Sequence, residues 1–226
     1  MTRTAALAAN FDELADGYDH ERHEEIARAV VAWVAPRPDE AAADVACGAG
    51  AVALHLAANR PGTARPVLAV DLSPRMIAVG RARAAALGGA PGIDWRVGDA
   101  VPLPVADQAL DLVFCASALH FLGRRALADW RRVLRPGGRV VFTLPLATHF
   151  SPSGAIAELL APDVPLPRSA READELAAAG GFTEPDSRVL PLGTRRVVMT
   201  SATHPAGPSR PRIRTGGTGA LPRPVG

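Results

Sequence analysis

The chain has 226 residues, of which 48% are apolar, and its formal net charge is +2. This length suffices for one domain with a sizeable core, and no apolar run reaches the length of a membrane-spanning helix. All 25 basic residues are arginine, and four of them lie without any acid in residues 205–226, so the rest of the chain shows no basic bias toward nucleic acid.

Cysteine content and the first residues indicate the compartment. Cys47 and Cys115 lie in apolar segments, and neither has a second cysteine at the spacing of a zinc or redox motif. Disulfides and metal sites are therefore disfavoured, and no metal is expected. The N-terminal residues include Asp12, Glu13 and Asp16 and lack a signal peptide's positive charge followed by an apolar run. We expect a cytoplasmic protein that does not bind membranes.

Residues 1–35 are predicted to be helical. Ile26, Val30 and Trp33 recur at helical spacing, which places them on one face, and Pro36 ends the helix. We expect residues 1–36 to form an N-terminal helical lid or substrate segment.

Strand-like and helix-like segments then alternate. The expected strands are 41–46, 66–71, 93–99, 109–116 and 139–145. The expected helices are 50–59, 73–87 and 123–134. Ser73 is a suitable N-cap for the second of these helices, with Pro74 in its first turn. This alternation predicts an α/β fold with a doubly wound, mostly parallel, Rossmann-like sheet.

The pattern changes after Pro145. Prolines in 146–168 favour a loop or a short cap, and 169–182 is predicted to be a helix. Residues 187–192 and 195–201 are predicted to be an antiparallel pair, which completes a seven-stranded sheet with an antiparallel last strand.

Composition changes again near the C-terminus. Residues 202–226 are rich in Pro, Gly and Arg and are expected to be a disordered tail. The predicted central domain therefore spans 37–201.

The stretch "ADVACGAGAVALHLA" carries the main functional signal. Gly48, Gly50 and Ala53 match the G-x-G-x-x-G/A turn that brings a backbone close to a dinucleotide. Asp44, four residues before Gly48, would repel a pyrophosphate, whereas it would favour a ligand carrying an ammonium or a sulfonium. S-adenosylmethionine has both groups together with an adenosine.

Several blocks of the sequence, in order, resemble class I S-adenosylmethionine-dependent methyltransferases of the small-molecule type. They are "FDELADGYD" (11–19), "DVACGAG" (44–50), "VLAVDLSPRMIAVGRAR" (67–83), "VGDAVPLPVADQALDLVFCASALHFL" (97–122) and "RVLRPGGRVVFT" (132–143). The resemblance covers roughly residues 10–145.

The resemblance implies which residues surround the cofactor. They are Asp44, Ala46, Gly48 and Gly50 for the turn at its methionyl end, Asp71 for the ribose hydroxyls, Leu72, Met76, Asp99 and Ala100 for the adenine, Ala116 and Ser117 near the sulfonium, and Tyr18 closing over it. Ala46 replaces the family's first glycine. We expect this alanine to cost little binding or stability, because it lies in the predicted strand 41–46, where the backbone is extended.

Structural alternatives exist for several of these residues. Asp71 suits the cap of the next turn as well as the ribose, and Asp99 suits a turn before Pro102. Cys47 fits a small buried residue better than a nucleophile. His120 fits either a general base for the acceptor or a packed histidine.

The implied reaction is in-line transfer of a methyl group to a small-molecule acceptor, with S-adenosylhomocysteine as the product. Residues 1–35 and 146–168, including His149 and Phe150, would form the acceptor site. Two alternatives stay open from the sequence: a nicotinamide-dependent oxidoreductase, and a non-catalytic relative that binds the cofactor. The sequence does not indicate the acceptor or the oligomeric state.

Overall fold

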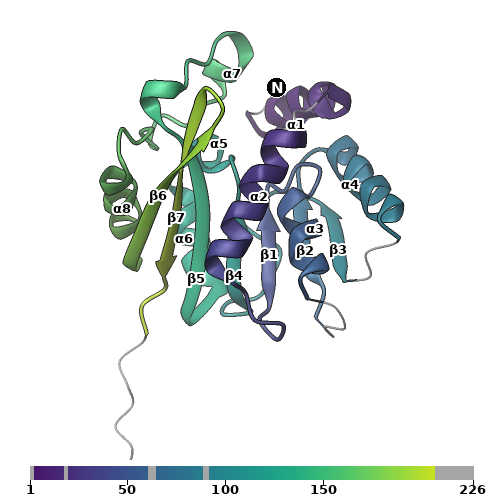
Figure 1. Cartoon of the computed structure of the whole chain (residues 1–226), viewed down its shortest axis with the longest axis horizontal. Coiled ribbons are helices and arrows are strands. Elements are labelled where there is room, and N and C mark those ends of the chain that lie inside the picture. The colour runs from purple at the N-terminus through teal and green to yellow at the C-terminus, as the bar shows by residue number, and fades with distance from the viewer. Residues whose placement is uncertain (1–2, 18–19, 61–64, 89–91, 207–226) are drawn as a thin grey trace, which may run out of the picture.

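The computed structural model describes residues 3–17, 20–60, 65–88 and 92–206, and its centre is one seven-stranded sheet (Figure 1). The strand order is β3-β2-β1-β4-β5-β7-β6. The strands are β1 (Ala42–Val45), β2 (Val67–Asp71), β3 (Ile93–Val97), β4 (Leu110–Cys115), β5 (Leu134–Pro145), β6 (Thr183–Leu192) and β7 (Arg195–Thr203). Strands β1 to β5 pair in parallel, while β7 is antiparallel to both β5 and β6. The predicted fold class is confirmed.

Helices cover both faces of the sheet. They are α1 (Arg3–Leu14), α2 (His20–Val34), α3 (Ala51–Ala58), α4 (Pro74–Ala86), α5 (Leu119–Leu122), α6 (Arg125–Val133), α7 (Gly154–Glu158) and α8 (Ala170–Ala179), with short 3-10 turns η1 (Ala15–Gly17) and η2 (Ala147–His149). One apolar cluster joins α2 and α3 to the sheet, and another joins α5, α6 and α8 to its opposite face. Within the described residues, no helix combines the length and apolar character needed to cross a bilayer.

Strand β1 shows why both faces are covered. All four of its residues are buried, with Ala43 and Val45 in the α6 cluster and Ala42 in the α2 cluster. Successive side chains of a strand point to opposite faces, so a central parallel strand must be apolar on both. Asp44 is the exception, and it lies at the functional end of the strand.

The "RPGG" segment (135–138), which lies between the predicted helix 123–134 and the predicted strand 139–145, is part of strand β5. The helix expected at 123–134 begins at Arg125, and the chain is already strand β5 from Leu134. Gly137 N–H donates to the His204 carbonyl, and His204 N–H donates to the Gly138 carbonyl. Pairing with the end of β7 therefore converts a local turn signal into extended strand.

The ends of the chain differ from the predicted segments in detail. The segment predicted to be helical contains α1, η1 and α2 in its described residues. Strand β7 runs to Thr203, two residues past the expected domain end at 201, and the tail from 207 onward lies outside the described residues. In Figure 1, α1 and α7 lie at the same end of the molecule, where the apolar side chains of Leu7, Phe121 and Leu159 form one cluster.

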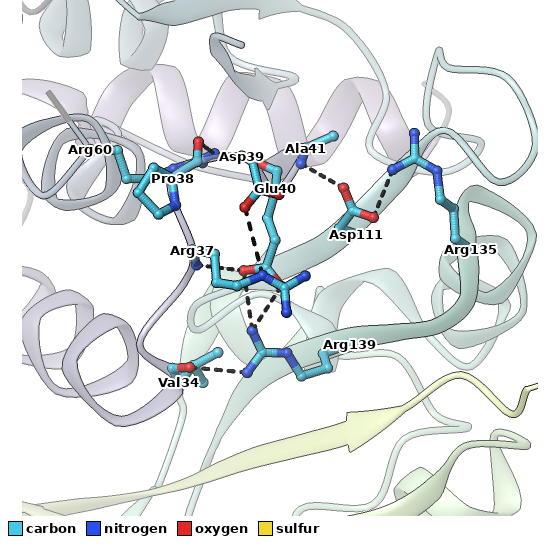
Figure 2. Close-up of polar contacts among 10 residues, drawn as sticks. All are labelled: Val34, Arg37, Pro38, Asp39, Glu40, Ala41, Arg60, Asp111, Arg135 and Arg139. Carbon is cyan, nitrogen blue, oxygen red and sulfur yellow. Dashed lines mark hydrogen bonds and ion pairs between the residues drawn. The ribbon is translucent and has the colours of Figure 1, made fainter. Parts of the chain in front are cut away.

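The opposite end of the sheet is held by a buried carboxylate (Figure 2). Glu40, 5% exposed, lies just before β1 and accepts from the backbone N–H of Arg37 at 2.7 Å and from the Arg139 guanidinium at 3.2 Å. Arg139 also donates to the Val34 carbonyl at 3.0 Å, and Arg60 donates to the carbonyls of Pro38 and Glu40. This network joins the end of α2, the start of β1 and strand β5.

We expect Glu40→Ala to lower the free energy of unfolding by about 3 kcal/mol, because removing one member of a buried ion pair leaves the other charge uncompensated. Chemical denaturation measures the change. Glu175→Ala is the matched control, since Glu175 pairs with Arg171 on the surface of α8, and it should cost less than about 1 kcal/mol. Equal effects for the two variants would contradict a structural role for Glu40.

Candidate functional site

A cavity opens at the carboxyl ends of β1, β2 and β4. In the strand order β3-β2-β1-β4-β5, successive strands are added in one direction from β1 to β3 and in the other direction from β4 onward. Ligands of open α/β sheets bind at this switch point between β1 and β4. The lining residues are Leu7, Phe11, Ala46, Gly48, Asp71, Leu72, Met76, Ala100, Ala116, Ser117, Ala118, Phe121 and Leu122. We call this the nucleoside cavity, because a carboxylate in an apolar wall suits a ribose beside a base.

Most of the predicted cofactor residues line this cavity, namely Ala46, Gly48, Asp71, Leu72, Met76, Ala100, Ala116 and Ser117. Asp44 lines an adjoining hollow that shares Ala46, Gly48 and Ala116 with the cavity. Gly50 and Asp99 line neither space, and Tyr18 lies outside the described residues.

Asp71 ties the glycine turn to the end of β2. Its Oδ2 accepts from Gly48 N–H at 2.7 Å, and its Oδ1 accepts from Ser73 N–H at 2.9 Å. The side chain is 8% exposed, and burial raises the pKa of this carboxyl, with the Asp12 charge adding to the rise. The capping role and a ligand role are compatible, because a carboxylate has lone pairs beyond those two bonds.

Asp44 is more deeply buried and is held by the helix that follows the turn. It is 1% exposed, and its Oδ2 accepts from Ala53 N–H in the first turn of α3 at 2.9 Å. Burial is the main reason that its pKa is raised from 3.8 to about 7, and Asp71 adds to the rise, while the bond from Ala53 opposes it. A cationic ligand in the adjoining hollow would lower this pKa again.

The expectation for Ala46 was wrong. Its φ is 51°, so the residue lies in the left-handed region instead of extending the strand. A β-carbon in this region costs about 1–2 kcal/mol, which glycine would avoid. The turn is stable here because Cys47 N–H donates to the Val70 carbonyl at 3.0 Å and Asp71 holds Gly48.

Gly50 shows why the last glycine of the turn is required. Its φ is 74°, and a β-carbon placed there would approach the Trp95 ring to 2.2 Å. Gly50 therefore lets the turn pass close to Trp95, and it contributes to the site through the shape of the turn.

Asp99 has the geometry expected of a turn residue, the alternative to an adenine contact. Its Oδ1 accepts from Val101 N–H at 2.9 Å, which is a local turn bond before Pro102. Ala100, the next residue, does line the nucleoside cavity. The adenine role of Asp99 stays a prediction.

Sequence reasoning missed two residues at the methionyl end. Arg83 of α4 lines the hollow beside Asp44 and donates to the Ala49 carbonyl at 3.0 Å, and it also pairs with Glu24 of α2. His23 lines the same hollow. Nothing in the local pattern of α4 marks Arg83, because it reaches the turn only through the packing of α4 against β2 and β3.

Asp12 lay within a quoted block but had no assigned role. It accepts from the Ser73 hydroxyl and, at 3.2 Å, from Arg75 N–H, so an acid caps the N-terminus of α4 from the end of α1. This contact holds α1 over the nucleoside cavity, where Leu7 and Phe11 line the wall.

The residues present fit S-adenosylmethionine. The hollow at the turn contains a carboxylate, Asp44, and a guanidinium, Arg83, which complement the ammonium and the carboxylate of an amino-acid end. The nucleoside cavity offers Asp71 for hydroxyl groups and the side chains of Leu72 and Met76 for a flat base. The two spaces adjoin at Gly48 and Ala116, as a single ligand with both ends requires.

A second, wider cavity, the outer cavity, adjoins the nucleoside cavity. Its lining residues are Phe11, Leu14, Gly17, Arg22, His23, Ile26, Ser117, His120, Phe121, Pro145, His149, Phe150, Ile156, Arg195, Arg196 and Val197. It includes His149 and Phe150, the two residues expected at an acceptor site.

His120 lies on the wall of the outer cavity and is 4% exposed. Its ring packs against Phe121 at 4.2 Å between centroids with a tilt of 40°, and it meets Phe150 edge-on at 5.9 Å. Burial lowers the pKa of His120 to about 4, and Nδ1 has no hydrogen-bond partner. The imidazole is therefore neutral near pH 7.

The two cysteines have no catalytic environment. Burial, with Asp44 and Asp71 nearby, raises the pKa of the Cys47 thiol well above its usual value. Thiolate is then scarce, as expected for a small packed residue. Among the described residues, no group of three His, Cys, Asp or Glu side chains is arranged to hold a metal ion.

Comparison with known proteins identifies a family match and several relatives. Residues 43–142 match the family described as "Methyltransferase domain". The chain is 35% identical to the ubiquinone/menaquinone biosynthesis C-methyltransferase UbiE of Paracoccus denitrificans over 60% of its own length and 54% of the relative, and 37% identical to that of Acidiphilium cryptum over 59% and 53%. The chain thus spans about half the length of the curated relatives it matches.

Solved structures share the fold at low sequence identity. A S-adenosylmethionine-dependent methyltransferase from Aquifex aeolicus superposes with a TM-score of 0.64 at 18% identity, covering 87% of this chain and 97% of that one. The [4+2]-cyclase SpnF superposes with a TM-score of 0.63 at 19% identity, covering 81% and 82%. The chain carries a class I S-adenosylmethionine-dependent methyltransferase domain, and S-adenosylmethionine is the cofactor of this class.

We expect Asp71→Ala to weaken S-adenosylmethionine binding by about 30- to 1,000-fold, since charged hydrogen bonds to hydroxyls contribute roughly 1.5–3 kcal/mol each. The same variant should also lose folding stability, because the buried N–H groups of Gly48 and Ser73 lose their acceptor. Calorimetric titration and thermal unfolding measure the two effects. Asp94→Ala, at an exposed ion pair on β3, is the control, and an unchanged affinity in folded Asp71→Ala would remove this residue from the site.

We expect Ala46→Gly to leave the protein as stable or to stabilise it by up to about 1 kcal/mol, because relief of the left-handed alanine outweighs the extra chain entropy of glycine. Ala43→Gly is the control, since Ala43 is a buried residue of β1 with no positive φ, and it should destabilise. Thermal and denaturant unfolding compare the variants. A loss of stability in Ala46→Gly as large as in Ala43→Gly would contradict the inference that the left-handed backbone of Ala46 is strained.

The raised pKa of Asp44 gives a pH dependence. In the free protein the carboxyl holds its proton up to about pH 7, whereas the unfolded chain loses it near 3.8, so ionisation of Asp44 makes stability fall as the pH rises through this interval. A cationic ligand favours the ionised form. Affinity for S-adenosylmethionine should therefore rise between pH 5.5 and 7, by at most about tenfold per pH unit, with release of a proton.

Titrations in buffers of different ionisation enthalpy measure that proton. Asp44→Asn keeps an acceptor for Ala53 N–H and should remove most of the pH dependence, while Asp94→Asn should keep it. A slope that persists unchanged in Asp44→Asn would show that another group titrates.

Proposed function

We propose that the protein transfers a methyl group from S-adenosylmethionine to a small-molecule acceptor bound in the outer cavity. The observation that carries this proposal is the junction of the two cavities, where Phe11, Ser117 and Phe121 line both. An acceptor in the outer cavity then faces a methyl donor in the nucleoside cavity. This is the arrangement that in-line displacement needs.

Bound S-adenosylmethionine supplies an activated methyl group, since its neutral thioether product leaves with the electrons of the broken C–S bond. The protein's part is positioning and exclusion of water. Ser117 lies at the junction with a φ of 62°, and its N–H donates to Thr143 Oγ1 at 2.8 Å. The strand ends of β4 and β5 thereby fix the wall between the two ligands.

Phe11 and Phe121 complete the junction from other elements. Their rings meet edge to face at 5.6 Å, so α1 and α5 close the junction with apolar surface. Asp12 ties α1 to the start of α4. Helix α1 therefore contributes both to the wall of the nucleoside cavity and to the cover of the junction.

His120 is the candidate proton acceptor. Its neutral ring lines the outer cavity and accepts a proton from an acceptor atom that must lose one on methylation. With a pKa of about 4 it is a weak base, which suits an acidic C–H or O–H more than an amine. Its contacts with Phe121 and Phe150 also serve packing.

The names of the relatives suggest carbon as the methylated atom, because the matched proteins are described as C-methyltransferases. The family match disfavours the nicotinamide-dependent alternative. The non-catalytic alternative and other chemistry on this fold are tested by turnover, since a fold does not fix a reaction. Cytoplasmic location stays a prediction.

The deciding experiment is turnover with isotopically labelled S-adenosylmethionine on a panel of phenols, quinols, enolisable acids and amines. The expected result is label in one acceptor class together with S-adenosylhomocysteine. Tight cofactor binding with no turnover on any class would favour a non-catalytic role, and micromolar binding of NAD without binding of S-adenosylmethionine would overturn the proposal.

With an acceptor in hand, His120→Phe should lower kcat by roughly 10²–10⁴-fold if the ring takes the proton. Phenylalanine retains the apolar volume and should leave affinity for S-adenosylhomocysteine within about threefold, less than one lost hydrogen bond would change it. Phe150→Leu is a control for packing at the same ring. Equal losses of kcat in both variants would assign His120 to packing alone.

A further inference from the structure

We infer that the acceptor is an amphipathic anion whose carboxylate or phosphate is bound by Arg195 at the end of the outer cavity remote from the methyl group. This inference rests on the proposed function and adds the chemical class of the acceptor. It comes from the charge of the cavity wall and from the way the cavity joins its neighbours.

The wall of the outer cavity is apolar and cationic. Its charged or titratable lining residues are Arg22, His23, His120, His149, Arg195 and Arg196. Among its described lining residues there is no aspartate or glutamate. The other lining side chains are mostly aromatic or aliphatic, so the cavity matches an apolar body that carries negative charge.

Shared lining residues give the cavity a direction. At one end it shares Phe11, Ser117 and Phe121 with the nucleoside cavity. At the other end it shares Arg22 and Arg195 with an outer hollow between α2 and the β6–β7 turn. The reacting atom of an acceptor therefore lies at the inner end, and its anionic group lies at the arginine end.

Arg195 is the residue best placed to bind the anion. It is the first residue of β7, next to the turn, and its side chain is exposed. Strand alternation places it on the same face as Val197, which packs in the α2 cluster, so it faces the side where Arg22 and His23 lie.

Among the described residues, two acids lie near this end, and neither belongs to the wall of the outer cavity. Glu21 and Glu25 line the outer hollow with Arg195. Among the ion pairs recorded for the described part of the chain, none includes Arg195. Its fork of donors matches a carboxylate or a phosphate in two-point contact.

The anionic group and the methylated atom of the acceptor lie at opposite ends of the outer cavity. An acid group held at the arginine end is a binding handle, and the methyl group goes to a different atom near Ser117 and His120. The inference therefore argues against esterification of that same acid group.

Binding of defined probes tests this inference without turnover. The probes are 4-butylbenzoate, 4-butylphenyl phosphate and the neutral 4-butylbenzyl alcohol, titrated by calorimetry into protein saturated with S-adenosylhomocysteine. We expect at least one anion to bind about tenfold or more tightly than the alcohol, as a charge-assisted hydrogen bond implies. Whichever anion gains more distinguishes a carboxylate from a phosphate as the natural handle.

Arg195→Gln should reduce the preference to less than about threefold, because it keeps hydrogen bonding and removes the charge. Arg171→Gln, at an exposed position on α8 outside the cavity, should keep the full preference. The preference should also fall between 0.05 and 0.5 M salt.

Native protein that binds the alcohol as tightly as both anions, or that binds none of the probes, overturns the inference. A preference that persists in Arg195→Gln overturns the role of Arg195. Saturation with S-adenosylhomocysteine is measured first, and turnover on the acceptor panel is measured separately. Failure of the proposed function therefore appears as absent cofactor binding or absent turnover, whereas failure of this inference appears as an absent charge preference.

Discussion

The bond from Gly48 N–H to Asp71 is the interaction on which the rest of the site depends. At 2.7 Å it joins the turn after β1 to the last residue of β2. The turn contains left-handed residues at Ala46, Gly48 and Gly50, and a backbone of this kind persists only when its surroundings over-determine it. The bond to Asp71 holds the turn on one side, and the Trp95 ring packs closely against it on the other.

The same arrangement concentrates buried negative charge. Asp44 and Asp71 are both less than a tenth exposed, and burial raises the pKa of each. Burying two carboxylates is unfavourable in the free protein, and a ligand with an ammonium and a sulfonium would relieve this cost. The electrostatics of the free site therefore predict a preference for a cationic ligand over a pyrophosphate.

The amino ends of the strands carry a stabilising network, and the carboxyl ends carry the functional site. At the amino ends of the strands, Glu40 is fully paired and joins α2, β1 and β5 (Figure 2). At the carboxyl ends, His120 Nδ1 has no hydrogen-bond partner, and Ala46 and Ser117 lie in the left-handed region. Elements from far apart in the chain, α1, α5, α7 and the β6–β7 turn, close this end over the two cavities.

The sequence by itself determined the order of strands and helices, the glycine turn and the caps, because these depend on short-range periodicity and on residues with restricted backbones. Ser73 caps α4 as its spacing indicates, with its hydroxyl accepting from Met76 N–H. Most of the predicted cofactor residues also line one cavity, since motif spacing fixes which strand ends carry them. The tertiary structure decided what depends on distant partners. Pairing with β7 extended β5 through "RPGG", the bonds to Val70 and Asp71 fixed the turn around a left-handed Ala46, and the packing of α4 on the sheet brought Arg83 to the turn. The charge of the outer cavity likewise comes from α2 and β7, more than 160 residues apart, and no local pattern connects them.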